Sequence, residues 1–239
     1  MNTCKKCESE FQGNYCHNCG TPLTLRRING KYILSEIGSL FNFEKGFLYT
    51  IRELIIRPGE NIRIFIQEDR NRLVKPIIFL ILCSLLYTLA QQAFQWEDGY
   101  VTGNIGESTV TNFLIWIQNN YGYANVFMGL FIGLWTRTMF RKSGFNIYEN
   151  LIVIFFAMGI GMLIFAMFGI VVSVTGWKIL PFGGIIGVLY AIWVIGSFFY
   201  KGKVSTYIKA FFAYFLGYFT FMILVVLIAF LIDLISKGS

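Results

Sequence analysis

Four cysteines near the start of the chain have the spacing of a metal site. Cys4 and Cys7 form one CxxC pair and Cys16 and Cys19 form a second, with eight residues between the pairs. Two such pairs can place four thiolates at the corners of a tetrahedron, as closed structural zinc sites do. The sequence therefore predicts a Zn²⁺ site with Cys4, Cys7, Cys16 and Cys19 as its ligands.

Two other interpretations of these cysteines stay open at this point. They could form disulfides or a redox CxxC motif, although two pairs so close together without a βαβ pattern favour metal. His17, the one histidine of the chain, could replace a cysteine as ligand or could be a solvated residue beside the second pair. A segment of roughly twenty residues has almost no core, so the metal would supply most of its folding energy. We expect residues 1–27 to form a cytosolic zinc ribbon that docks a partner.

The rest of the chain has the composition of a membrane protein. The 239 residues are 56% hydrophobic, 18% aromatic and only 14% charged, which excludes an ordinary soluble domain. Five apolar runs each have about the length needed to cross roughly 30 Å of hydrocarbon. They are residues 76–94, 124–140, 151–174, 181–200 and 209–232. We expect an all-α integral membrane protein with about five transmembrane helices over residues 76–239.

The positive charges predict the orientation of these helices. The formal net charge is +7, and twelve of the 20 Lys and Arg residues lie at or before Lys75. With five spans, eighteen basic residues fall on one side of the membrane and two on the other. Because cytoplasmic loops carry the excess of Lys and Arg, we expect a cytoplasmic N-terminus and a periplasmic or extracellular C-terminus.

The segment 28–75 is basic and amphipathic. Apolar residues recur at helical spacing within 33–41, 47–55 and 62–66, and Pro58-Gly59 interrupts the pattern. Helices of this kind lie in the plane of the membrane interface, although packing into a small soluble bundle is an alternative. The side chains expected to contact anionic headgroups or a partner are Arg57, Arg63, Arg70, Arg72 and Lys75.

This segment resembles a bacterial family of small membrane proteins, domain-of-unknown-function family 3667. Besides the four cysteines, the matching residues are Lys45-Gly46-Phe47, Thr50, Glu53-Leu54, Arg57-Pro58-Gly59, Ile62-Arg63, Arg70, Pro76 and Phe79. Glu68-Asp69-Arg70 stands where the family has a Gly-Lys/Arg-Arg-like element. The resemblance covers about residues 1–90 and implies a zinc ribbon, a linker and a few transmembrane helices, with no activity.

Few residues of the membrane half suggest chemistry. Arg137 is the one charged residue that lies inside an apolar run and not at its end, and such residues are candidates for function. It lies near the cytoplasmic end of its helix, where snorkelling to the headgroups is the competing interpretation. Small residues four apart, such as Gly129 and Gly133, favour close helix packing within the bundle or an oligomer.

These patterns favour a scaffold, sensor or regulatory protein of the bacterial inner membrane over an enzyme. An oligomeric channel or small transporter is the alternative, and a membrane-bound lipid-modifying enzyme is the third interpretation. The expected partners are anionic lipids and a protein at the ribbon. A homo-oligomer is left open, and nucleic acid is not expected, since basic residues near the ribbon equally fit the membrane orientation.

Overall fold

The computed structural model describes residues 2–4, 7, 9–11, 13, 16–19, 46–96, 121–200 and 203–237 of the chain. One expected feature, the helical pattern at 33–41, lies outside these residues. The chain divides into two compact units, Met1–Asn42 and Phe43–Ser239.

The first unit contains a short β-hairpin. Strands β1 (Asn2–Thr3) and β2 (Glu10–Phe11) pair antiparallel, with Thr3 opposite Glu10. The backbone amide of Cys4 donates a 3.0 Å hydrogen bond to the carbonyl of Ser9 and so closes the turn between the strands. Cys4 and Cys7 therefore lie between the two strands of the hairpin.

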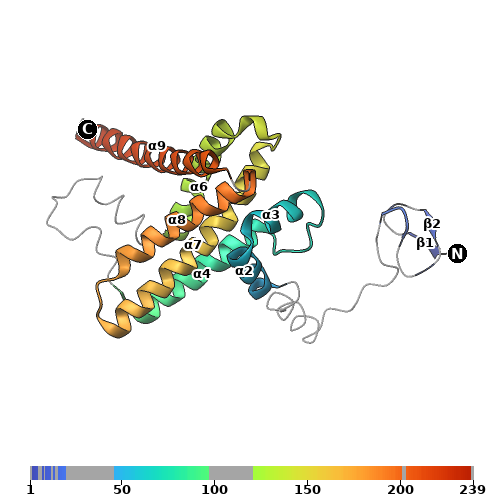
Figure 1. Cartoon of the computed structure of the whole chain (residues 1–239), viewed down its shortest axis with the longest axis horizontal. Helices are drawn as coiled ribbons and strands as arrows, with labels where there is room; N and C mark the ends of the chain where they lie inside the picture. The colour runs from blue at the N-terminus through green and yellow to red at the C-terminus, as the bar shows by residue number, and fades with distance from the viewer. Residues whose placement is uncertain are drawn as a thin grey trace. The chain divides into compact units, whose positions relative to one another are not determined.

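The second unit is helical throughout the part that the structure describes. Its helices are α2 (Phe47–Ile56), α3 (Pro58–Gln67), α4 (Pro76–Phe94), α6 (Tyr121–Met139), α7 (Ile147–Thr175), α8 (Leu180–Phe199) and α9 (Val204–Lys237), with a 3₁₀ turn, η1, at Arg141–Ser143 (Figure 1). For this unit the all-α prediction is confirmed over the described residues.

Local sequence explains where several of these helices begin and end. Helices α3, α4 and α8 each have proline in the first two positions, where the missing N–H costs nothing. Helix α7 begins with a capping box, in which Asn146 accepts from the amide of Glu149 and the Glu149 carboxylate accepts from the amide of Asn146. It ends at Gly176, whose φ of 73° is left-handed.

Four of the helices are long and apolar enough to cross a membrane. They are α4, α7, α8 and the Val204–Ile232 part of α9. The remaining expected span, residues 124–140, corresponds to α6, a helix of 19 residues that is not among these four. The chain therefore has the helices of a membrane protein, and the crossing of α6 stays a prediction.

Helix α7 packs against α4, α6 and α8, and small residues allow close approach at these contacts. The ring of Phe79 on α4 lies over Gly159, and the side chain of Leu151 covers Gly133 of α6. Gly161 and Gly187 bring the backbones of α7 and α8 together. The small-residue positions noted in the sequence thus serve packing inside the bundle.

Aromatic contacts define one end of the bundle. Phe140, after α6, stacks on Phe199 at the end of α8 with ring centroids 4.0 Å apart. Phe145, before α7, lies 4.7 Å from the ring of Phe198. The α6–α7 connection and the C-terminal end of α8 therefore share this end, which also carries Arg141 and Lys142 of η1.

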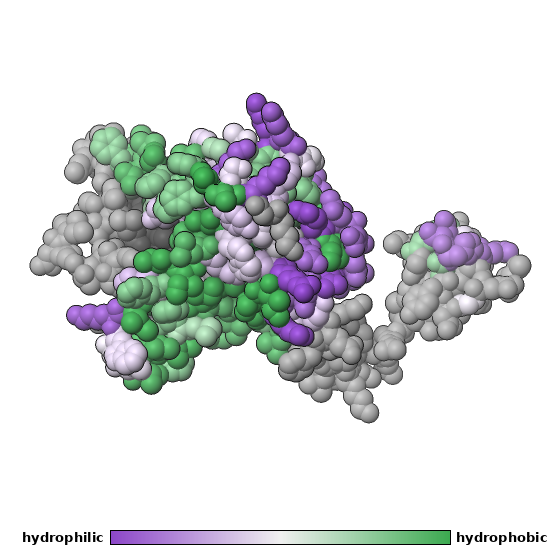
Figure 2. All heavy atoms as spheres, viewed as in Figure 1, coloured by the Kyte–Doolittle hydropathy of each residue, from purple (hydrophilic) through white to green (hydrophobic). Residues whose placement is uncertain are grey.

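The opposite end is defined by the C-terminal ends of α4 and α7. The hydroxyl of Ser173 donates to the carbonyl of Phe94, and the indole of Trp96 packs on Gly169. Between the two ends, large apolar side chains such as Ile81, Leu85 and Leu89 of α4 are exposed. Figure 2 shows this hydrophobic surface over α4, α7 and α8, with hydrophilic residues gathered around α3. Such a belt between polar ends matches a hydrocarbon layer.

Replacing Gly217 by alanine should destabilise the bundle. A Cβ there would lie 2.7 Å from the backbone nitrogen of Ile132, which cannot move without shifting α6. We expect a loss of about 1–3 kcal/mol, measured as a lower thermal midpoint of the purified protein in detergent. Gly161→Ala is the matched control, because its nearest neighbour would be 3.9 Å away. Equal midpoints for the two variants would contradict the tight α6–α9 contact.

Candidate metal centre and helical corner

The side chains of the four predicted ligands meet in the first unit. The sulfurs of Cys4, Cys7, Cys16 and Cys19 all lie within 4.8 Å of one another. The Cys4 and Cys19 sulfurs are 3.4 Å apart, and those of Cys7 and Cys16 are 3.6 Å apart. Tetrahedral zinc with Zn–S bonds of about 2.3 Å needs sulfurs about 3.8 Å apart. The four cysteines could therefore hold a metal ion, as predicted.

Ser9 favours the thiolate form of two of these cysteines, Cys7 and Cys16. Its hydroxyl lies 3.0 Å from the sulfur of Cys7 and 3.3 Å from that of Cys16. Hydrogen bonds from the Ser9 side chain and backbone, helped by Cys19, lower the pKa of Cys7 to about 6. The Ser9 side chain also lowers the pKa of Cys16. Thiolates are the form of cysteine that binds metals, so these hydrogen bonds favour metal binding at Cys7 and Cys16. His17 is exposed and lies outside the cluster.

The second notable arrangement is the corner between α2 and α3. Helix α2 ends where Pro58 cannot donate a hydrogen bond, and α3 begins at the same residue. The side-chain amide of Asn61, which is 2% exposed, donates to the carbonyls of Glu53 and Arg57 at 3.0 and 3.1 Å. These carbonyls belong to the last turn of α2 and to the break itself, so Asn61 fixes the angle between the two helices.

The segment after α3 folds back onto this corner. Arg72 donates to the side-chain oxygen of Asn61 at 3.2 Å and pairs with the Glu53 carboxylate at 3.3 Å. The buried hydroxyl of Thr50 donates to the carbonyl of Gly46 and accepts from the amide of Val74, each at 3.0 Å. The corner and the start of α4 are thus joined by hydrogen bonds.

The corner packs tightly on α8. Gly59 lies against the backbone of Ser197, where an added Cβ would come within 2.6 Å of the Ser197 carbonyl oxygen. The guanidinium of Arg63 donates to the carbonyl of Phe198 and, at 3.4 Å, to that of Phe199. The hydroxyl of Tyr190 donates to the carbonyl of Leu54 at 3.0 Å. Arg63 of α3 therefore satisfies two carbonyls that the end of α8 leaves without helical partners.

The apolar side chains predicted for this region are partly buried in the protein core and partly exposed on its surface. Phe47 and Leu54 of α2 and Ile62 and Phe65 of α3 are buried in the core. Leu48, Ile55 and Ile56 of α2 are exposed. The buried set packs the corner on α7 and α8, and the exposed set leaves a face for the membrane interface, which stays a prediction.

The basic residues predicted to contact headgroups have different surroundings. Arg57, Arg70 and Lys75 are exposed, whereas Arg63 and Arg72 are half-buried and bonded to protein groups. Arg137 is also half-buried, and its guanidinium donates to the carbonyl of Arg141 at 3.3 Å. The acceptor lies in η1, just beyond the end of α6, as expected of an arginine reaching toward the interface.

Sequence reasoning missed Asn61, Tyr190 and Ser197 as parts of this site. Asn61 had a local signal, since a polar side chain interrupts an apolar face three residues after proline. Tyr190 and Ser197 had none, because they meet the corner more than a hundred residues along the chain.

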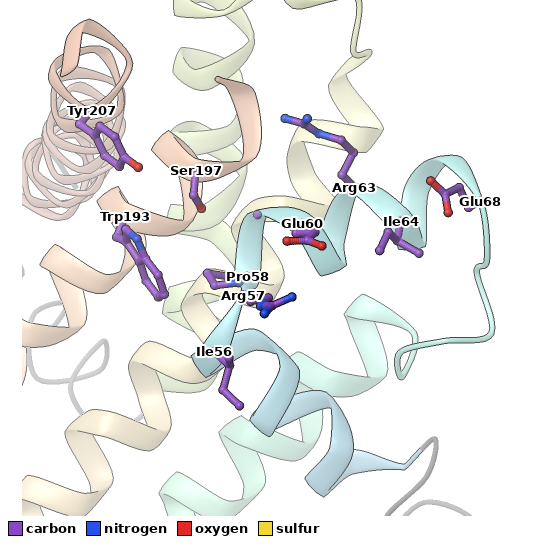
Figure 3. Close-up of a pocket in the computed structure, with 11 residues that line it drawn as sticks. Ile56, Arg57, Pro58, Glu60, Arg63, Ile64, Glu68, Trp193, Ser197 and Tyr207 are labelled. Carbon is purple, nitrogen blue, oxygen red and sulfur yellow. The ribbon is translucent and has the colours of Figure 1, made fainter. Parts of the chain in front are cut away.

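A cleft of about 600 Å³ opens beside the corner (Figure 3). Its lining comes from the end of α2, from α3, and from α8 and α9. It combines apolar, aromatic and charged side chains, which are Ile56, Arg57, Pro58, Gly59, Glu60, Arg63, Ile64, Glu68, Trp193, Ser197 and Tyr207.

Arg63→Lys should weaken the docking of α3 on α8. Lysine keeps the charge but lacks the planar fork that reaches two carbonyls. We expect a destabilisation of about 1–3 kcal/mol, seen as a lower thermal midpoint in detergent. Arg70→Lys, on an exposed arginine of the same segment, should leave the midpoint unchanged. A midpoint for Arg63→Lys equal to that control would show that the two carbonyl contacts contribute nothing.

Cys16→Ser should abolish metal binding while leaving membrane insertion intact. The purified chain is expected to carry about one zinc ion, measured by elemental analysis, because four thiolates complete a structural site. His17→Ala is the matched control and should retain the metal, since His17 lies outside the cluster. Unchanged metal content in Cys16→Ser would exclude the four-cysteine site.

In the comparison with known proteins, one family matches the segment that contains the corner. A family described as "Protein of unknown function (DUF3667)" matches residues 44–88, which contain α2, α3 and most of α4. Searches of curated proteins and of solved structures found no match to this chain. Over residues 44–88, the chain matches the DUF3667 family that its linker residues predicted.

Proposed function

We propose that this protein is a scaffold, sensor or regulatory protein of the bacterial inner membrane whose zinc-binding hairpin docks a cytosolic partner protein. The observation that carries the proposal is the division into two units, one with a four-cysteine cluster and one with four membrane-length helices. A metal-stabilised hairpin presents a fixed backbone surface without needing a core of its own.

The charge distribution supports a cytosolic hairpin. In the helical unit, Arg63, Arg141 and Lys142 gather at the end where α6 connects to α7 and where α8 ends. The positive-inside rule assigns that end to the cytoplasm. Helix α4 begins at this cytoplasmic end and runs away from it, so the segment before α4 also begins in the cytoplasm. Thiols stay reduced there and are available to zinc.

The proposal is tested by photo-cross-linking in native membranes. A photoreactive residue at exposed Asn18 should give a discrete protein adduct that disappears in Cys16→Ser and after zinc chelation. The same residue at Tyr148, which is 75% exposed at the start of α7, serves as control and should be indifferent to both treatments.

Two results would contradict the proposal. Adducts at Asn18 that are unchanged by Cys16→Ser and by chelation would show that the metal-bound hairpin recruits nothing. Ion flux into proteoliposomes well above that of empty vesicles would favour the channel or transporter interpretation instead.

A further inference from the structure

The cleft beside the helical corner has the size and composition of a ligand site. Its volume of about 600 Å³ lies in the range of small-molecule sites, about 300–1,000 Å³. In Figure 3, α3 lies on one side with Arg63 and Glu68, and Trp193, Ser197 and Tyr207 lie on the other. The lining is drawn from four helices, all within the second unit.

The position of the cleft along the helices matches the headgroup level of a membrane. Trp193 precedes the last residue of α8, Phe199, by six residues, or about 9 Å along the axis. Tyr207 follows the first residue of α9, Val204, by three residues, or about 5 Å. If α8 and α9 cross the membrane, the cleft lies where the hydrocarbon layer gives way to polar groups, and aromatic residues prefer that depth.

The charged groups of the cleft balance each other. Arg57 and Arg63 contribute two positive charges, and Glu60 and Glu68 contribute two negative charges. The Arg57 side chain is exposed, while its backbone is held at the corner by hydrogen bonds with Glu53 and Asn61. A guanidinium recognises a phosphate, and a carboxylate or an aromatic face recognises an ammonium group. A ligand with both groups fits this lining better than a simple anion.

An apolar track leads away from the cleft along α8. Ile186, Leu189 and Trp193 are spaced three and four residues apart and therefore share one face of the helix. All three are exposed, Leu189 by 58%. This face could take up an acyl chain whose headgroup occupies the cleft.

We infer that the cleft binds the headgroup of an amine-bearing zwitterionic phospholipid of the phosphatidylethanolamine type. Arg57 contacts the phosphate, Glu68 on the α3 side of the cleft receives the ammonium group, and the chains run along α8 past Trp193. The inference does not depend on zinc or on a docked protein. It depends on α8 and α9 lying in a membrane.

The test is native mass spectrometry of the full chain in detergent, titrated with phosphatidylethanolamine, phosphatidylglycerol and phosphatidylcholine that carry the same acyl chains. We expect one phosphatidylethanolamine per chain, bound at least about threefold more tightly than the other two lipids. Glycerophosphoethanolamine, which has the headgroup without the chains, should bind far more weakly, because it cannot use the apolar track.

Matched variants distinguish lipid binding in the cleft from general electrostatic attraction between the protein and lipid headgroups. Arg57→Gln should weaken phosphatidylethanolamine binding by about threefold to tenfold. Arg52→Gln removes the same charge from an exposed position of α2 outside the cleft and should change nothing. Glu68→Gln should reduce the preference for phosphatidylethanolamine over phosphatidylglycerol. Thermal midpoints equal to that of the unmodified chain would show that each variant is folded.

Three results would overturn the inference. Equal effects of Arg52→Gln and Arg57→Gln would mean diffuse attraction to headgroups without a site. Phosphatidylglycerol binding as tightly as phosphatidylethanolamine would exclude recognition of the ammonium group. Glycerophosphoethanolamine binding as tightly as the lipid would assign the cleft to a soluble phosphate compound.

Discussion

The contact between α3 and the C-terminal end of α8 is the interaction on which the helical unit depends. The last carbonyls of a helix have no partners within it, and leaving them unsatisfied in apolar surroundings is costly. Arg63 donates to two of them, and Gly59 lets the α3 backbone approach closely enough for this to happen. Because α8 packs on α7, and α7 packs on α4 and α6, this contact fixes one end of the whole bundle.

Several residues of the segment that matches the family form this contact or hold the corner that makes it. Thr50 and Glu53 bind the segment that follows α3, Pro58 makes the corner, and Gly59 and Arg63 attach it to α8. The amphipathic pattern of the segment first suggested helices lying on a membrane surface. In the structure, much of the apolar stripe is the buried face of a docked corner, and a smaller apolar face of α2 remains exposed.

Sequence alone predicted the parts whose signals are local. The cysteine spacing predicted the cluster, and Pro76 followed by an apolar run predicted a span with the bounds of α4. It could not predict which faces of α7 and α8 meet, because a helix that is apolar all round has no preferred side in its pattern. The hydrogen bond from Tyr190 to Leu54 joins residues 136 positions apart, and no local pattern encodes such a pair. Helix α6 contains Asn125, Thr136 and Arg137, which weaken the apolar signal of the span expected at 124–140.

The most direct test of the docked corner places a photoreactive residue at the contact itself. Tyr190→p-benzoylphenylalanine, expressed in native membranes, puts the reactive group where the tyrosine hydroxyl meets the carbonyl of Leu54 at 3.0 Å. A docked corner should give an intramolecular cross-link to the peptide that contains Leu54, identified by mass spectrometry after proteolysis. Adducts with lipid alone, and none with α2, would contradict the docking of this segment on α8.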